Sequence, residues 1–565
     1  MLTPWGESLD KNNVLQEYPR PQLRRDSYLN LNGLWDYVFT DTPDIPRHFE
    51  GEILVPFSPE SELSGVGRAL QPGEYLWYRY MSELPEDFNQ GRLLLHFGAV
   101  DQIATVWVNG YELKRHAGGF TPFSVDITEA VKSRRLIILV CVQDFGDYSW
   151  HSRGKQKSKR GGIWYTPQSG IWQTVWLESV PENYIRGLRI KPHFDTQQVE
   201  LWVAGEGECH AEIDGEAYAF EAGQPAVLDL KELHPWTPET PYLYQMSLRL
   251  GEDRVESYFA MRKFSVGKDE KGVPRLFLNN KAYFHNGLLD QGYWSDGLLT
   301  APSDEAMIFD IQTAKNMGFN MLRKHIKLEP FRWYYHCDRL GMLVWQDMPN
   351  GGDRYSPLTI SAPLVTGWHW KDHHYRLFGR KYEEGRKQYL QELREMINAL
   401  YNCPCIAMWV PFNEGWGQFD ARKVCAAIRR MDSSRTIDHA SGWHDQGIGE
   451  VQSLHVYFRP YRFRPDRLGR AVLLSEFGGY NHRVQGHSFS EKDFGYKRYN
   501  SLNSLHFALR DLYGGQIRPA KEEGLAAAVY TQLSDVEDEL NGLITYDRRV
   551  VKIAPALMKV LVKMD

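Results

Sequence analysis

From residue 266 to the end, short apolar runs alternate with longer amphipathic stretches, and this alternation constrains the fold more than any other feature of the chain. Ser303, followed by acidic residues, marks the start of one helical stretch, and residues 383–402 form another. Helical periodicity is weak after the fifth and sixth runs. Eight strands that alternate with helices predict a (β/α)8 TIM barrel over residues 266–565. The runs expected to be strands are 284–291, 321–326, 343–348, 406–414, 436–442, 454–457, 472–479 and 526–533.

The first 265 residues instead contain short runs rich in Tyr, Trp, Val and Leu, with turn residues between them and no long helical period. Asn109-Gly110, between two such runs, is a strong hairpin signal. The pattern predicts a β-sandwich of the jelly-roll kind over residues 1–181. A further set of alternating strands predicts an immunoglobulin-like β-sandwich over residues 182–265. The chain is therefore expected to be a multidomain protein with two β domains before the barrel.

Composition excludes several classes of protein. The net charge of −6 argues against a general nucleic-acid binder. No apolar run approaches the ~18 residues of a membrane span, and the N-terminal segment lacks the basic and apolar regions of a signal peptide. The six cysteines are sparse, and Cys403 and Cys405 are one residue apart, unlike the pairs of zinc or redox motifs. We therefore expect a cytoplasmic protein with reduced thiols and without nucleic-acid or membrane partners.

Polar residues interrupt two apolar strands of the predicted barrel. Asn413 and Glu414 end the fourth strand, and Ser475 and Glu476 lie within the seventh. An uncompensated carboxylate beside a strand core costs several kcal/mol, so both acids need a reason. One is an ion pair that closes the barrel top. The other is glycoside hydrolysis, for which facing strands would hold two carboxyl groups ~5 Å apart and give retention of configuration.

At the level of whole segments the sequence resembles glycoside hydrolase family 2, which contains β-galactosidases, β-glucuronidases and β-mannosidases. The resemblance covers nearly all of the chain. It implies a jelly-roll sugar-binding domain, an immunoglobulin-like domain and a catalytic barrel, and a retaining β-glycosidase activity. The segments that carry it are "LNLNGLWDY", "GIWQTVWLE", "FLNNKAYFHNG", "RWYYHCDRLGMLVWQDM", "WVPFNEGWG", "LLSEFGG" and "GLITYDRR".

The resemblance also implies roles for individual residues. Glu414 is expected to be the general acid/base, with a pKa raised by apolar surroundings and by a neighbouring carboxylate. Glu476 is expected to be the nucleophile and to stay ionised. Asn413 matches the position that binds the sugar 2-hydroxyl, and Tyr457 the tyrosine that touches the nucleophile.

Three further residues are expected to line the pocket. His455 and His325 match pocket positions by the resemblance, although a core role for His455 is the alternative. Trp443 is a candidate stacking platform for a sugar ring, and a core tryptophan is nearly as good an interpretation.

Two positions depart from the family pattern. The Asn-x-Lys motif with which its β-glucuronidases bind the sugar carboxylate is replaced here by Glu539-Leu540-Asn541. An Asp that often contacts sugar hydroxyls from the first domain is replaced by Trp164. An ordinary glucuronidase or galactosidase pocket is therefore not expected.

Basic residues nevertheless gather near the predicted mouth. Arg323 and Lys324 end the second strand, Arg354 follows the third, and the segment 151–162 is rich in Lys and Arg. A solvated basic surface is the alternative interpretation. Because Arg and Lys are natural partners of carboxylates, we expect an anionic sugar, with a β-galacturonide as the first choice. A neutral β-galactoside is comparably favoured, and a β-mannoside comes third.

Other classes of function are weighed against this one. A non-catalytic carbohydrate-binding protein would have no reason to keep all of Glu414, Asn413, Glu476 and Tyr457. A metal-dependent hydrolase would need a ligand set such as His-x-His at a strand end, and no G-x-G-x-x-G nucleotide motif follows a strand. We therefore expect no metal and no cofactor, a small glycoside as the substrate, and a homodimer.

Overall fold

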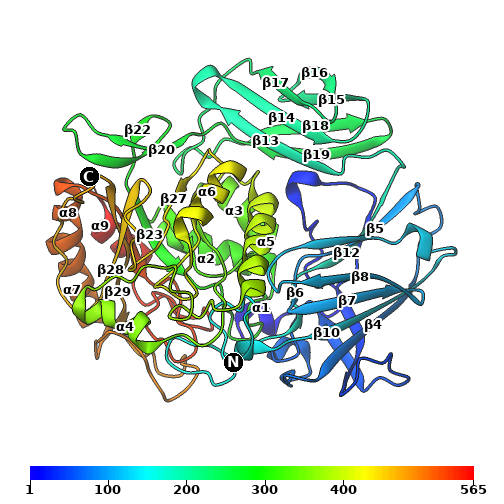
Figure 1. Ribbon diagram of the computed structural model, residues 1–565, viewed down its shortest axis with the longest axis horizontal. Coiled ribbons are helices and arrows are strands. Elements are labelled where there is room, and N and C mark those ends of the chain that lie inside the picture. The colour runs from blue at the N-terminus through cyan, green and yellow to red at the C-terminus, as the bar shows by residue number, and fades with distance from the viewer. Residues whose placement is uncertain (565) are drawn as a thin grey trace.

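The computed structural model describes residues 1–564, and the chain forms two β-sandwiches and a barrel (Figure 1). The first sandwich and the barrel lie side by side, and the second sandwich lies across one end of both (Figure 1). The multidomain class predicted from the sequence is confirmed, including the barrel. In the described part of the chain, no helix combines the length and apolar character that a membrane crossing requires.

The first sandwich packs two antiparallel sheets around one apolar core, which includes Trp35, Tyr78 and Leu177. One sheet has the order β3 (Gly51–Val55), β2 (Gly33–Thr40), β4 (Tyr75–Glu83), β10 (Arg135–Gln143), β7 (Ile103–Val108) and β8 (Tyr111–Ala117). The other has the order β1 (Tyr28–Asn30), β12 (Val175–Val180), β5 (Arg92–Phe97) and β9 (Phe123–Asp126). The predicted hairpin joins β7 and β8, with Asn109 and Gly110 at φ values of 48° and 90°.

Short elements complete this part of the chain. They are α1 (Pro4–Glu7), η1 (Pro21–Leu23), η2 (Glu62–Ser64), the pair β6 (Val100–Asp101) and β11 (Gly170–Ile171), η3 (Thr128–Ala130) and η4 (Gly146–Tyr148). The segment after η4 leaves the sandwich and reaches the barrel, where Ser152 and Gly351 form an isolated bridge.

The second sandwich also has two antiparallel sheets. The first has the order β13 (Gly187–His193), β14 (Gln198–Ala204) and β17 (Pro225–Asp229), with η5 (Phe194–Thr196) between β13 and β14. The second has the order β16 (Glu216–Glu221), β15 (Glu208–Ile213), β18 (Tyr244–Leu250) and β19 (Asp253–Phe259). A separate sheet of β20 (Phe264–Lys268), β21 (Pro274–Leu278) and β22 (Lys281–Ala282) follows. The expected division at 265/266 falls inside β20, so we propose a division between β19 and β20.

The barrel is a nearly closed sheet of eight parallel strands, and each predicted run overlaps one of them. The order is β27 (Thr436–Ile437), β26 (Ile406–Val410), β25 (Leu343–Asp347), β24 (Met321–Lys324), β23 (His285–Asp290), β32 (Leu525–Thr531), β29 (Ala471–Gly478) and β28 (Val451–Val456). The sheet is open between β27 and β28. β27 has only two residues, so there is little backbone there to continue the ladder.

Helices cover the outside of the barrel after most strands. They are α2 (Asp304–Asn316), α3 (Phe331–Leu340), α4 (Pro357–Thr366), α5 (Glu383–Leu400), α6 (Ala421–Met431), α7 (Leu502–Leu512), η6 (Tyr513–Ile517), α8 (Arg518–Glu523) and α9 (Pro555–Val562). The Ser303 hydroxyl accepts from the Ala306 N–H and caps α2, as its sequence signal predicts. Within residues 1–564, no helix directly follows β27 or β28. This agrees with the weak helical periodicity of the sequence after the fifth and sixth predicted strands. Beside the barrel mouth, β30 (Tyr480–Asn481) pairs with β31 (Lys497–Arg498).

Candidate active site

Glu414 stands on a tight turn just after β26. Pro411 and Phe412 follow the strand, and the Glu414 N–H donates to the Ser441 carbonyl at 2.9 Å. Glu414 has a φ of 50°, a left-handed conformation that costs a residue with a Cβ about 1 kcal/mol or more. The Trp443 indole N–H donates to its carbonyl at 3.0 Å and helps to hold the turn. The side chain is thereby aimed into the barrel mouth instead of along the strand.

Glu476 lies within β29 and is only 4% exposed. The Arg323 guanidinium donates to Oε1 at 3.0 Å, and the Tyr457 hydroxyl donates to Oε2. Burial by itself would raise the pKa of Glu476, but the adjacent His455 and Arg323 outweigh it and lower that pKa to about 2. Glu476 is therefore a carboxylate at any ordinary pH.

Arg323 reaches Glu476 from β24 and is itself fixed by Asp347 at the end of β25. Two hydrogen bonds join the guanidinium to the Asp347 carboxylate, at 3.0 and 2.9 Å, and His325 Nδ1 lies 2.8 Å from the same carboxylate. Burial lowers the pKa of His325, so this ring is neutral. Asp347 was not predicted as a site residue, although it ends the apolar run "LVWQD" in the same way that Glu414 ends its own.

His455 connects the two acids. Its Nδ1 lies 2.9 Å from Glu414 Oε1, and its Nε2 lies 3.0 Å from the Ser441 hydroxyl and 3.5 Å from Glu476 Oε1. The ring is therefore part of the site and not of the core. Because its partners come from different strand ends, its position fixes the geometry of both carboxyl groups.

The site contains three potential ligand atoms that all lie within 4.8 Å of one another, one each from Glu414, His455 and Glu476. Three such atoms could hold a metal ion, which the sequence spacing did not indicate because the residues come from separate strands. Arg323, however, already supplies positive charge to Glu476. The same separation fits two carboxyl groups that act on one glycosidic bond.

Asn413 joins this group through Arg323, which donates to its Oδ1 at 2.7 Å. This contact fixes the orientation of the amide. Its Nδ2 is buried and has no hydrogen-bond partner among residues 1–564. A buried donor left without a partner costs about 1–3 kcal/mol, so the amide is poised to donate to a ligand in the barrel mouth.

Three candidates from the sequence lie differently from what was expected. Lys324 points to the opposite face of β24, where it pairs with Asp290 at 2.6 Å and lies over the Trp333 ring. Arg354 is exposed, and its guanidinium has no hydrogen-bond or ion-pair partner in the described chain. Trp443 is 6% exposed and meets His455 edge-on, so it supports the turn and the histidine. Among the described residues, the hydrogen-bond and ion-pair partners of the Glu476 carboxylate are Arg323, Tyr457 and His455, and not these three.

Tyr496 and Trp416 were not singled out from the sequence because the chain has 18 Trp and 31 Tyr. Tyr496 stacks on Tyr457 with ring centres 3.7 Å apart. Trp164, from the first sandwich, lies against Trp416, which follows Glu414 closely in sequence, at 5.1 Å. No local pattern distinguishes these rings from core residues. Only their meeting at the barrel mouth identifies them.

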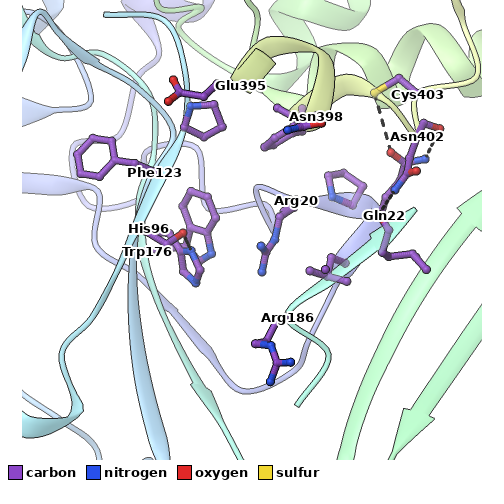
Figure 2. Close-up of a pocket in the computed structure, with 18 of the residues that line it drawn as sticks. Arg20, Gln22, His96, Phe123, Trp176, Arg186, Glu395, Asn398, Asn402 and Cys403 are labelled. Carbon is purple, nitrogen blue, oxygen red and sulfur yellow. Dashed lines mark hydrogen bonds between the residues drawn. The ribbon is translucent and has the colours of Figure 1, made fainter. Parts of the chain in front are cut away.

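A cavity of about 390 Å³ lies elsewhere, where the two sandwiches meet the barrel (Figure 2). Its walls include Trp176 from the first sandwich, Arg186 from the segment that leads into the second, and Asn398 from α5. It contains none of the predicted site residues. The carboxylate pair at the barrel mouth is thus not part of this cavity.

Comparison with known proteins is consistent with this geometry. Residues 70–181 match the model for "Glycosyl hydrolases family 2, sugar binding domain", and residues 183–262 match "Glycosyl hydrolases family 2". Residues 274–472 match "Glycosyl hydrolases family 2, TIM barrel domain". Glu414 lies inside this last range, and Glu476 lies just beyond its end.

Among curated proteins, a β-galactosidase of Thermoanaerobacter pseudethanolicus is 24% identical over 439 residues. The match covers 72% of this chain but only 54% of that protein, so the chain spans about half of its length.

Among solved structures, the β-D-glucuronidase of Dictyoglomus thermophilum aligns over 97% of this chain and 98% of its own, with a TM-score of 0.74 and 17% identity. The β-galacturonidase of Eisenbergiella tayi, bound to galacturonate, aligns over 97% and 99%, with a TM-score of 0.71 and 18% identity. At these identities the likeness establishes the fold alone.

Proposed function

The chain belongs to glycoside hydrolase family 2, and from this premise we propose that it is a retaining exo-β-glycosidase that removes a terminal β-linked hexose-type sugar by double displacement. The observation that carries the proposal is the separation of the acids: an oxygen of Glu414 and one of Glu476 lie within 4.8 Å. Retaining enzymes hold their carboxyl groups about 5–5.5 Å apart, whereas inverting enzymes need about 6.5–9.5 Å to admit a water molecule.

Glu476 is the proposed nucleophile. Its depressed pKa keeps it ionised, and Arg323 and Tyr457 hold its two oxygens in fixed directions. One carboxylate oxygen attacks the anomeric carbon as the bond to the leaving oxygen breaks. The product of this step is a glycosyl ester of Glu476 and a free aglycone.

Glu414 is the proposed general acid and base. Its proton passes to the leaving oxygen in the first step. In the second step Glu414 takes a proton from water, whose oxygen bonds to the anomeric carbon and releases Glu476. The contact between His455 and Glu414 Oε1 orients the carboxyl group for both transfers.

Asn413 is the proposed partner of the sugar 2-hydroxyl. Its unpaired Nδ2 is a donor beside the nucleophile, and Arg323 keeps that donor from rotating away. A contact there strengthens as positive charge develops on the sugar ring in the transition state. The bound sugar would therefore satisfy a donor that has no partner within residues 1–564.

The proposed sugar is a β-uronide, with a β-galacturonide as the first choice. Glu539 stands where the family's β-glucuronidases bind the sugar carboxylate, but its own carboxyl group accepts hydrogen bonds from the Tyr165 hydroxyl and from Asn541. It therefore offers no donor to a sugar carboxylate. The names of the structural relatives support acidic sugars, and the curated β-galactosidase supports a neutral β-galactoside as the second candidate. A β-mannoside is third. A non-catalytic carbohydrate-binding protein is the alternative outside enzymes.

The test is hydrolysis of the 4-nitrophenyl β-galacturonide, β-galactoside, β-glucuronide and β-mannoside, compared as kcat/KM. We expect Glu476→Gln to lower kcat by about 10⁴-fold or more on every substrate that is cleaved. Glu414→Gln should slow nitrophenyl substrates less than alkyl glycosides, since nitrophenolate leaves without protonation. NMR of the first-formed sugar should show the β anomer. An α anomer, or a fully active Glu476→Gln protein with unchanged thermal unfolding, rules the proposal out.

A further inference from the structure

Most buried basic side chains around the barrel mouth already have partners. Arg323 is bound by Asp347 and Glu476, and Lys327 by Glu329 at 2.7 Å. Arg153 donates to the Gly352 carbonyl at 2.6 Å. Lys155 differs from them. It is 7% exposed, yet its ammonium group has no hydrogen bond or ion pair with any residue from 1 to 564.

Lys155 is held in place from both sides. The N–H groups of Arg153 and Gly154 both donate to the Asn350 carbonyl on the barrel rim, at 2.9 and 3.1 Å. The Lys155 carbonyl accepts from the Tyr165 N–H at 2.9 Å. Its backbone, although part of a connection that leaves the first sandwich, is thus fixed to the barrel. Little backbone freedom would remain to be lost when the ammonium binds a ligand.

Aromatic rings flank the ammonium group. Lys155 Nζ lies 5.3 Å from the centre of the Trp416 ring and 5.9 Å from that of Tyr165. The Trp416 ring in turn packs against Trp164. The rings attract a cation weakly and do not neutralise its charge.

The charge of Lys155 acts on three buried carboxyl groups, one of which is the proposed nucleophile. Burial raises the pKa of Glu539, and Lys155 opposes that rise, as it does for Asp347; it also lowers the pKa of Glu476. The ammonium is therefore near Glu476 without being hydrogen-bonded to it. A mostly buried ammonium group without a direct hydrogen-bond or ion-pair partner among residues 1–564 is free to bind a negatively charged ligand.

We propose that Lys155 binds the carboxylate of a uronide in the active site and so determines the preference for acidic sugars. This inference rests on the proposed glycosidase function. Lys155, from the segment that leaves the first sandwich, then binds the sugar carboxylate. The barrel sequence Glu539-Leu540-Asn541 does not provide this contact. Lysine suits the task as a compact point charge, which one carboxylate balances.

The experiment compares a charged and a neutral substrate that otherwise differ by one methyl group: 4-nitrophenyl β-galacturonide and its methyl ester. The variants are Lys155→Met, which keeps the length of the side chain, and Lys159→Met, an exposed control in the same segment. We expect Lys155→Met to lower kcat/KM for the acid by about 100- to 1000-fold and to change that for the ester less than about 3-fold. Lys159→Met should change neither.

A second measurement does not depend on turnover. Galacturonate binding is titrated by calorimetry in the Glu476→Gln protein, with and without Lys155→Met. We expect Kd to rise by about 100-fold when Lys155 is lost. Lys155→Arg, which keeps the charge, should retain a preference for the acid over the ester even if its rate falls.

The outcomes separate the two proposals. An equal loss on acid and ester would mean that Lys155 acts only through Glu476 or the fold, and it overturns the carboxylate assignment. Unchanged selectivity and unchanged galacturonate binding overturn it as well. A failure of the proposed glycosidase function would look different. The unmodified protein would then cleave no glycoside, although galacturonate would still bind through Lys155.

Discussion

Glu476 shows how a single carboxyl group is kept ionised inside a barrel. Burial disfavours its charge, while Arg323 donates to one oxygen and Tyr457 to the other. Arg323 is in turn neutralised by Asp347, so the positive charge beside the nucleophile is firmly held but not excessive. The reactive oxygen is thus charged, oriented and shielded from water.

Tyr457→Phe tests this balance at the residue scale. Loss of a donor to Glu476 disfavours the ionised form, so the pKa of Glu476 should rise from about 2. The acid limb of the kcat/KM profile should then move to higher pH, and kcat should fall by roughly 10- to 100-fold. The measurement is the pH dependence of kcat/KM on the best nitrophenyl glycoside.

Tyr461→Phe is the matched control, since the Tyr461 hydroxyl is buried and has no hydrogen-bond partner in the part of the chain that is described. Its profile should coincide with that of the unmodified protein. A uniform fall in rate for Tyr457→Phe with the acid limb in its original place would contradict the proposed effect on Glu476.

At the scale of elements, the segment 151–165 matters most, because it connects the first sandwich to the barrel mouth. Ser152 bridges Gly351, and Trp164 packs on Trp416. Gly154 lies at the closest approach: its φ is 63°, and a Cβ placed there would be 3.1 Å from the Ile326 carbonyl oxygen. A side chain at this position would crowd the docked segment and would strain its backbone.

Gly154→Ala should therefore displace the segment. We expect a loss of stability of about 1–2 kcal/mol and a fall in kcat/KM of at least about 10-fold on the preferred acidic sugar. The measurements are thermal unfolding and the nitrophenyl panel.

Gly207→Ala, in the second sandwich, is the control that separates the effect of backbone strain from the effect of displacing the docked segment 151–165. Gly207 has a φ of 90°, and a Cβ there would meet nothing within 4 Å. It should lose a similar amount of stability and keep full activity. Equal activity of the two alanine variants would argue against a role for the docked segment.

At the scale of the whole molecule, one buried carboxylate ties the parts together. Glu178 of β12 is 0% exposed and accepts from Arg20 at 2.9 Å and from Arg25 at 3.0 Å. Arg25 also binds Asp253 of the second sandwich through two hydrogen bonds, at 2.9 and 2.8 Å. The N-terminal segment is thus an ionic link between the two sandwiches, and it lies beside the cavity of Figure 2.

Glu178→Gln should leave two arginines without compensation and cost about 3–5 kcal/mol, measured by urea unfolding at pH 7. Burial would raise the pKa of Glu178, but Arg20, His96 and Arg25 hold it well below 4.5. Because the folded-state pKa is depressed, this stabilisation is complete above pH 4.5 and is lost as the pH falls further. The difference between the two proteins should therefore shrink in acid.

Glu182→Gln is the control, since its pairing with Arg92 is exposed and should contribute less than about 1 kcal/mol. If both variants unfold alike at pH 7, Glu178 does not link the domains.

The sequence by itself determined the class of the fold and the candidate acids. Eight apolar runs gave eight strands because a buried strand must be apolar along its length, and this periodicity is local. Glu414 and Glu476 were identified because a carboxylate within such an apolar run costs free energy to bury unless hydrogen bonds or opposite charges compensate it.

The tertiary structure alone decided which neighbours those acids have. Lys324 and Arg323 are adjacent in sequence, yet the alternation of β24 sends one outward to Asp290 and the other inward to Glu476. Lys155 lies far from the barrel in sequence and reaches its mouth through a docked segment of another domain. Charge pairing depends on distances of a few ångströms between distant segments, and no pattern within one segment encodes them.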